Sequence, residues 1–232
     1  MGRGLGFDST TPCTAVAVDY DTGAPSAITR ADPLQNVIGE FARHFEVPVD
    51  RVVHVVRRNR LLVWVPCTRE TTPIFNQRLL SDSLAAFACS ANEVRAVGVG
   101  LMNHGAKGWA MSAEEAITAL DLARCCENKT KVHLYSDIAV YEGIRCSSSA
   151  LRYFESVLGE LTHEKGLLKT LECYFDKNQH RKATAAALEI HPNTLNYRLD
   201  RVEALLGVRL DAPSSIVPLF VALKMRHIPR LH

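Results

Sequence analysis

The chain has 232 residues, 47% of them hydrophobic, and a formal net charge of +2 at pH 7. This length permits one large domain or two small ones with real apolar cores. The sequence has no apolar run near the ~18 to 20 residues that cross a bilayer, and no signal peptide is visible before residue 12. These features exclude a membrane-spanning or secreted protein, so a soluble cytoplasmic protein is expected.

The seven cysteines are odd in number and scattered along the chain. No C-x-x-C pair and no Cys/His spacing of a zinc site occurs among them. Buried, reduced thiols are the expected state. The sequence also shows no nucleophile arrangement, such as Ser/His/Asp or Cys/His. We therefore expect no metal, no cofactor and no catalytic residues.

Strands and helices alternate through the first two-thirds of the chain. Ser112-Ala113-Glu114-Glu115 has the spacing of a capping box and predicts the start of the third helix. The order predicts one sheet covered by several helices, an α/β fold. The expected strands are 14–18, 52–56, 61–65, 94–101 and 132–135, and the expected helices are 33–45, 73–89 and 112–125.

Two segments of this region resemble ligand-binding loops. The turn Arg57-Arg58-Asn59-Arg60 could hold a phosphate or carboxylate, although a solvated hairpin tip or a protein contact is the simpler expectation. Residues 100–108 are glycine-rich, but Lys107 stands one place too late for a phosphate-binding loop and no Ser or Thr follows it. That stretch is predicted to be a surface loop.

Residues 147–161 are predicted to form a helix with one apolar stripe. Such a helix could connect two domains rigidly, pair with its copy in a dimer, or pack against its own domain. The stripe consists of Leu151, Phe154, Val157, Leu158 and Leu161.

Residues 182–206 read as a short helix, a break and a longer helix. The break ends at His191-Pro192, and proline suits the first turn of a helix. His191 is therefore the expected N-terminal boundary residue, and Gly207 is placed to end the helix. This arrangement is typical of a helix-turn-helix, which binds duplex DNA.

The two faces of the second helix differ in chemistry. Leu195, Leu199, Val202 and Leu206 form the expected buried stripe. The opposite face offers groups that hydrogen-bond base edges and phosphates in the major groove. Arg198 lies near the buried edge and could instead brace the fold. Base contacts are expected from His191, Asn193, Thr194, Asn196 and Tyr197, and phosphate contacts from Arg181, Lys182, Arg198 and Arg201.

Charge supports the nucleic-acid interpretation. Residues 163–232 contain 11 Lys and Arg against 7 Asp and Glu, a net charge of +4, whereas residues 1–162 have a net charge of −2. A basic module joined to an acidic one is the asymmetry expected when one part meets phosphate. An ordinary helical hairpin with a solvated polar face is the alternative, since Asp200 and Glu203 would repel phosphate.

The C-terminal motifs resemble those of the PucR/CdaR family of bacterial regulators of purine and sugar-diacid catabolism. The resemblance lies in residues 167–175, 183–187 and 202–207, and above all in Ile190-His191-Pro192-Asn193-Thr194-Leu195-Asn196-Tyr197-Arg198-Leu199. Pro192 and Asn196 replace two arginines of the family pattern, which affects base preference. The family also has a degenerate GGDEF diguanylate cyclase domain. This chain resembles that domain in its start, Leu5-Gly6-Phe7-Asp8, in the 94–101 strand and in the helix that follows this strand.

The resemblance implies an α/β domain of degenerate GGDEF type, an α+β sandwich, followed by an all-α helix-turn-helix domain. The expected boundaries are 1–146 for the first domain, 147–162 for a linker helix and 163–232 for the DNA-binding domain. The cyclase signature turn falls on residues 57–60, which lack its glycines and its metal-binding carboxylates. Cyclase activity is therefore not expected.

The sequence thus predicts a non-enzymatic transcriptional regulator that binds double-stranded operator DNA. A homodimer or larger homo-oligomer is expected, because a single helix-turn-helix usually needs a partner. A small-molecule effector is possible. The alternatives are a nucleotide-binding or cyclase-type signalling protein that acts through the α/β domain, and a protein-interaction module that uses the face of Asn193 and Tyr197.

Overall fold

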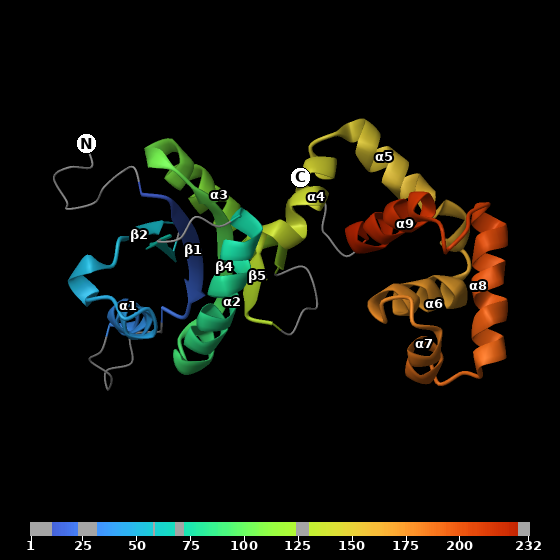
Figure 1. Ribbon diagram of the computed structural model, residues 1–232, viewed down its shortest axis with the longest axis horizontal. Coiled ribbons are helices and arrows are strands. Elements are labelled where there is room, and N and C mark those ends of the chain that lie inside the picture. Colours follow the sequence, from blue (N-terminus) through green and yellow to red (C-terminus); the bar gives the residue numbers. More distant parts are fainter. Residues whose placement is uncertain (1–10, 23–31, 58, 68–71, 124–129, 227–232) are drawn as a thin grey trace. The chain divides into compact units, whose positions relative to one another are not determined.

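The computed structural model describes residues 11–22, 32–57, 59–67, 72–123 and 130–226 (Figure 1). The chain folds as two compact units, Met1–Val140 and Tyr141–His232. The first is a sheet with helices on both faces, and the second is entirely helical. Within the described residues, no helix combines the length and apolar character required to span a membrane.

The first unit is built on a five-stranded mixed sheet with the order β2-β3-β1-β4-β5. β1 is central and pairs antiparallel with both β3 and β4, while β4 pairs parallel with β5. β2 and β3 form the expected antiparallel hairpin. The strands are β1 (Cys13–Tyr20), β2 (His54–Arg57), β3 (Arg60–Pro66), β4 (Val94–Asn103) and β5 (Val132–Leu134).

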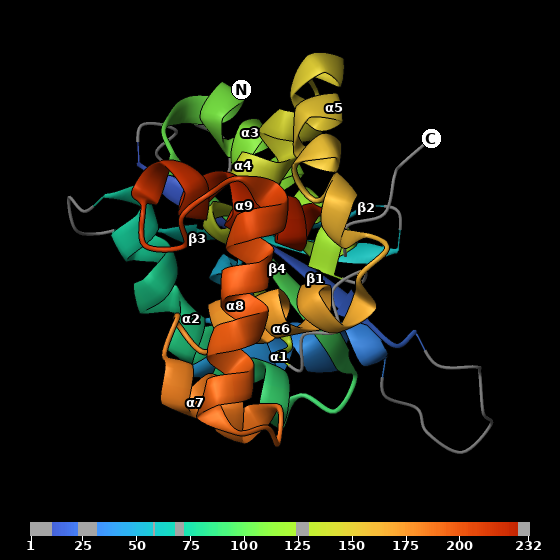
Figure 2. The same ribbon diagram turned by 90° about the vertical axis from the view of Figure 1, so that its right-hand side faces the viewer.

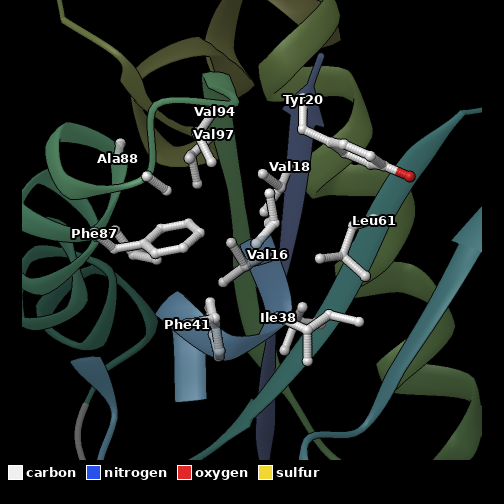
Figure 3. Close-up of a cluster of buried hydrophobic side chains, with 14 of the residues drawn as sticks. Val16, Val18, Tyr20, Ile38, Phe41, Leu61, Phe87, Ala88, Val94 and Val97 are labelled. Atoms are coloured by element: carbon white, nitrogen blue, oxygen red, sulfur yellow. The ribbon is translucent and has the colours of Figure 1, made fainter. Parts of the chain in front are cut away.

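Helices cover both faces of this sheet because β1 alternates its side chains between two cores. Val16 and Val18 point into a core shared with α1 and α2, where Phe41 and Phe87 meet edge to face at 5.4 Å (Figure 3). Ala15 and Ala17 point to the opposite face, under α3. The helices of this unit are α1 (Pro33–His44), α2 (Pro73–Ser90), α3 (Gly105–Ala123) and the start of α4 (Tyr135–Arg145), with the short 3-10 helix η2 (Val49–Arg51) before β2.

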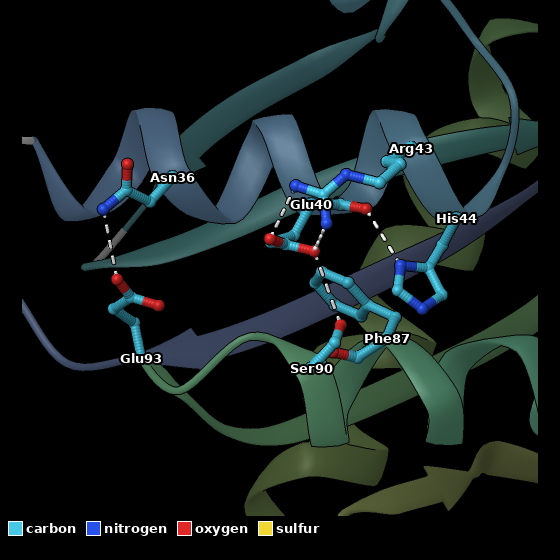
Figure 4. Close-up of polar contacts among 7 residues, drawn as sticks. All are labelled: Asn36, Glu40, Arg43, His44, Phe87, Ser90 and Glu93. Atoms are coloured by element: carbon cyan, nitrogen blue, oxygen red, sulfur yellow. Dashed lines mark hydrogen bonds and ion pairs between the residues drawn. The ribbon is translucent and has the colours of Figure 1, made fainter.

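Polar contacts join α1 to the C-terminal end of α2. Glu40 of α1 accepts a hydrogen bond from Arg43 Nη1 at 2.8 Å and one from Ser90 Oγ at 3.5 Å (Figure 4). Asn36 Nδ2 donates to Glu93 Oε1 at 3.2 Å. These contacts are exposed, so their contribution to stability is small beside that of the apolar core between the same helices.

The third helix begins at Gly105, not at Ser112, so the expected capping box is wrong. Ser112 is fully buried inside α3, where its Oγ accepts from Ala15 N at 2.8 Å and donates to Leu101 O at 2.6 Å. The pairing of β1 with β4 is irregular between Thr14 and Val16, and Ala15, which lies between them, has no register partner on β4. The serine hydroxyl therefore completes the hydrogen bonding of this β-bulge.

The expected surface loop over 100–108 is also wrong, because β4 runs to Asn103 and α3 begins at Gly105. Glycines bring the helix close to the strand. A Cβ atom on Gly98 would lie 2.1 Å from Ala116 O, and one on Gly100 would lie 2.1 Å from Ser112 O. The glycines of β4 thus reflect backbone contact between strand and helix, not a phosphate-binding loop.

The described cysteines are only partly as expected. Cys13 and Cys67 are buried, whereas Cys89 and Cys146 are exposed and Cys173 is intermediate. Burial raises the pKa of the Cys13 thiol to about 12, so this side chain stays protonated and unreactive. Cys89 lies on α2, Cys146 directly follows α4, and Cys173 lies in the helix Lys165–Asp176.

The second unit packs its helices around one apolar core. The helix expected over 147–161 divides into α5 and a 3-10 turn, and Leu158 and Leu161 enter this core. Ser147 caps α5 by accepting from Ala150 N at 3.3 Å. The elements are α5 (Ser148–Val157), η3 (Gly159–Leu161), α6 (Lys165–Asp176), α7 (Arg181–Ala187), α8 (Pro192–Leu206) and α9 (Pro213–Met225).

The close approach of α3 to β4 yields a stability prediction. Gly100→Ala should lower the free energy of unfolding of the first unit by about 1–3 kcal/mol or more, because the added methyl group would clash with the backbone carbonyl and with the buried hydroxyl of Ser112. Gly39→Ala in α1 is the matched control, since nothing lies within 4 Å of its Cβ position. Alanine at this helical position should raise stability by up to about 1 kcal/mol. Urea unfolding of both variants measures the difference, and equal effects would contradict the packing described.

Candidate nucleic-acid interface

The helix-turn-helix consists of α7 and α8, and α8 has defined ends. His191 is its N-cap residue, and its Nδ1 accepts from Asn193 N at 3.2 Å. Pro192 occupies the first turn, where its missing N–H is not needed. Gly207 ends the helix in the left-handed conformation, with φ of 64°, and donates its N–H to Glu203 O. The boundaries expected from the sequence are confirmed at both ends.

The turn between the helices depends on one residue with positive φ. Glu189 has φ of 54°, a conformation that glycine adopts readily and other residues adopt at a cost. It allows Glu189 N to reach Ala186 O at 3.2 Å and Ile190 N to reach Ala185 O at 3.0 Å. Carbonyl groups at the end of α7 are thereby satisfied before the chain enters α8.

Apolar side chains fix the rotation of α8. Leu195, Leu199 and Val202 are buried in the core of the helical unit, which confirms three members of the expected stripe. Leu206 is only partly buried, because it lies in the last turn beside Gly207. α8 lies along one side of this unit, with α7 near its N-terminal end (Figure 2).

With the leucines inward, the polar side chains of α8 share its outer face. Tyr197 is 70% exposed, an unusual degree for an aromatic ring. Asp200 lies on the same face, one turn beyond Asn196. The structure brings the expected base-contacting residues together on this surface: His191, Asn193, Thr194, Asn196 and Tyr197 are all exposed.

The four expected phosphate-binding cations occupy different environments. Lys182 and Arg201 are exposed. Arg198 is half-buried, and its Nη1 donates to Thr170 Oγ1 of α6 at 3.3 Å. Arg181 is exposed, but its Nη1 donates to Asn196 Oδ1 of α8 at 2.6 Å. Arg198 therefore joins α8 to α6, and Arg181 joins α7 to α8.

One positioning residue was missed by the sequence analysis. His180 caps α7 as His191 caps α8, its Nδ1 accepting from Ala183 N at 3.2 Å. The sequence contains the signal for this cap, because His180 has a side-chain acceptor and directly precedes Arg181, the first residue of α7. It fixes where α7 begins, and hence where Arg181 lies.

The arginine-rich hairpin of the first unit is occupied by protein contacts. Arg57 Nη1 forms an ion pair with Glu114 Oε1 of α3 at 2.8 Å. Arg60 binds Asp121 of the same helix through both terminal nitrogens, and this hydrogen bonding raises the pKa of the Arg60 guanidinium. Arg58 lies outside the described residues. Within the described part of the chain, no group of three His, Cys, Asp or Glu side chains is placed to hold a metal ion.

Comparison with known families matches both units. The model of the GGDEF-like domain matches residues 1–122, and that of the PucR C-terminal helix-turn-helix domain matches residues 167–225. The chain belongs to the PucR/CdaR family. Both domain types that its motifs suggested are thus confirmed, in the expected order.

Relatives in this family are named as regulators. The carbohydrate diacid regulator of Escherichia coli (strain K12) is 25% identical over 232 aligned residues, which cover 95% of this chain and 59% of that protein. The purine catabolism regulatory protein of Bacillus subtilis (strain 168) is 33% identical over 81 residues, 33% of this chain and 15% of that protein. The DNA-binding transcriptional activator AdeR of the same strain is 26% identical over 127 residues, 50% of this chain and 30% of that protein. The chain therefore matches less than two thirds of the length of each of these relatives.

The strained turn of this PucR-type domain gives a second prediction. Glu189→Gly should raise the free energy of unfolding of the helical unit by about 0.5–1 kcal/mol, because relief of the positive φ exceeds the added flexibility of the unfolded chain. Glu189→Ala removes the same charge but keeps the unfavourable conformation, so it should give no gain. Thermal unfolding of the two variants would contradict this explanation if both were stabilised equally.

Proposed function

We propose that this chain is a transcriptional regulator that binds double-stranded DNA through α7 and α8 and performs no chemistry there. The observation that supports this function best is the outer face of α8. It presents hydrogen-bonding side chains and one highly exposed aromatic ring on a helix whose rotation is fixed by buried leucines. A helix of this kind fits the major groove.

The base-reading residues of this proposal lie at the start of α8. The Asn193 side chain is exposed beside the N-cap and can form paired hydrogen bonds with adenine N6 and N7. Tyr197 lies one turn further and can contact the methyl group of thymine or donate to a phosphate. His191 and Thr194 border them, so the first turn and a half of α8 provides the sequence readout.

Phosphate contacts are proposed for Lys182 and Arg201, whose side chains are exposed on α7 and α8. Cations at such sites position the protein on the duplex without reading sequence. Arg198 is proposed chiefly to hold α8 against α6, since its guanidinium contacts Thr170 Oγ1. It contributes positive potential near the interface from that position.

The GGDEF-like unit is proposed to regulate or to mediate self-association, not to catalyse. A cyclase turn needs glycines for nucleotide approach and carboxylates for metal, whereas Arg57 and Arg60 occupy this hairpin and bind Glu114 and Asp121. A homodimer or larger homo-oligomer in the cytoplasm, bound to paired half-sites and open to a small-molecule effector, completes the proposal.

A third prediction concerns base contact. Asn193→Ala should weaken binding to a duplex selected from a random pool by about 1–3 kcal/mol, because one bidentate base contact is lost. Binding to a scrambled duplex of the same length should change little, since the side chain is uncharged. Fluorescence anisotropy on both duplexes at one salt concentration measures this. Equal losses on the two duplexes would place Asn193 outside the base-reading set.

A fourth prediction concerns the first unit. Incubation of the whole chain with GTP and Mg²⁺ should give no cyclic dinucleotide, because the hairpin offers cations where a cyclase presents metal-binding carboxylates. Chromatography of the nucleotides after prolonged incubation checks this, with an active diguanylate cyclase as the positive control. Any turnover above that of buffer would overturn the non-catalytic assignment.

A further inference from the structure

One contact of the helix-turn-helix joins a cation to a base-reading residue. Arg181 is the first residue of α7, and Asn196 lies on the outer face of α8. Arg181 Nη1 donates to Asn196 Oδ1 at 2.6 Å, and both side chains are exposed. The hydrogen bond is charge-assisted and short, so it restricts both side chains.

The chemistry of arginine fixes the orientation of the asparagine amide. A guanidinium group only donates hydrogen bonds, whereas an amide has an accepting end and a donating end. The Asn196 amide must therefore turn Oδ1 towards Arg181, which leaves its Nδ2 amino group to an outside ligand. An unpaired asparagine could rotate by 180° and offer either end.

We propose that Arg181 is a specificity-determining positioning residue that makes Asn196 a hydrogen-bond donor towards the base edge. This inference rests on the proposed DNA-binding function and specifies which base the Asn196 position prefers. In the major groove, guanine presents two acceptors, adenine one acceptor and one donor, thymine one acceptor, and cytosine one donor. The Asn196 position should therefore prefer guanine and reject cytosine.

The positive charge of Arg181 acts in the same direction. A cation beside Oδ1 repels a second donor, such as the amino group of adenine or cytosine, and attracts the acceptor atoms N7 and O6 of guanine. The remaining N–H groups of the guanidinium can reach the same acceptors or an adjacent phosphate. An asparagine that would otherwise favour adenine is thereby directed to guanine.

Lys182 provides a matched control for this role. It is adjacent to Arg181 on α7, it is exposed, and it forms no ion pair with any residue that the structure describes. Removal of either cation deletes one positive charge near the DNA. The general electrostatic loss should be alike in the two variants, so a difference in base preference isolates the contact with Asn196.

The test is selection of bound sequences from a random duplex pool by the whole chain and by the variants Arg181→Ala, Lys182→Ala and Asn196→Asp. The wild-type protein and Lys182→Ala should select the same motif, with guanine at the Asn196 position. Arg181→Ala should reduce the preference for guanine over adenine at that one base pair by about tenfold, the size of one base contact. Circular dichroism melts show whether each variant is folded.

Asn196→Asp adds an independent measurement. The aspartate keeps its pairing with Arg181 but presents an acceptor outward, so the preferred base should change from guanine to cytosine, whose N4 amino group donates. If Arg181→Ala selects the same motif as the wild-type protein at uniformly lower affinity, Arg181 is only a phosphate contact. That result would overturn this inference but leave the proposed DNA-binding function standing. A wild-type chain that selects no motif would instead refute the proposed DNA-binding function itself.

Discussion

Burial of Leu195, Leu199 and Val202 is the constraint on which the proposed interface depends. Successive residues of a helix are 100° apart, so a rotation of α8 by one position would replace leucines in the core with Asn196 or Asp200. Unpaired polar groups in that core would be strongly unfavourable. The leucines thus hold the side chains proposed to read bases outward, while the histidine cap and the left-handed Gly207 set where the helix begins and ends.

A different constraint shapes the GGDEF-like unit, where α3 lies directly on the sheet. Glycines on β4 and alanines on β1 permit this approach, and the Ser112 hydroxyl joins Ala15 N to Leu101 O across the bulge. The same helix places Glu114 and Asp121 beside the arginines of the β2–β3 hairpin. The close packing therefore also gives Arg57 and Arg60 acidic partners within the protein.

Local patterns predicted most of the fold, and tertiary contacts account for the errors. The order of strands and the two helices of the motif follow from periodicity, caps and Pro192, and they are confirmed. The family follows instead from the resemblance of sequence motifs, and it is confirmed as well. The start of α3 was missed because Gly105 and Gly108 resemble a loop until Gly108 is seen packed against Asn103. No element was predicted for residues 213–225, where α9 forms with Pro218 inside it. Helical packing around its neighbouring leucines outweighs the lost hydrogen bond.

The cations of the motif show most clearly what sequence alone cannot separate. Helix periodicity already placed Arg198 near the buried edge, and its contact with Thr170 joins it to the fold. Arg181, Lys182 and Arg201 are alike in charge, and only the contact with Asn196 distinguishes Arg181 and directs it to the proposed base-reading face. Only Lys182 and Arg201 then act chiefly as phosphate contacts in the proposed complex. Since each neutralised phosphate adds about 0.9 to the salt slope, affinity in this domain should depend less on salt than its cation count suggests. Its discrimination between sequences would rely correspondingly more on the hydrogen bonds of α8 and on the pairing of half-sites in an oligomer.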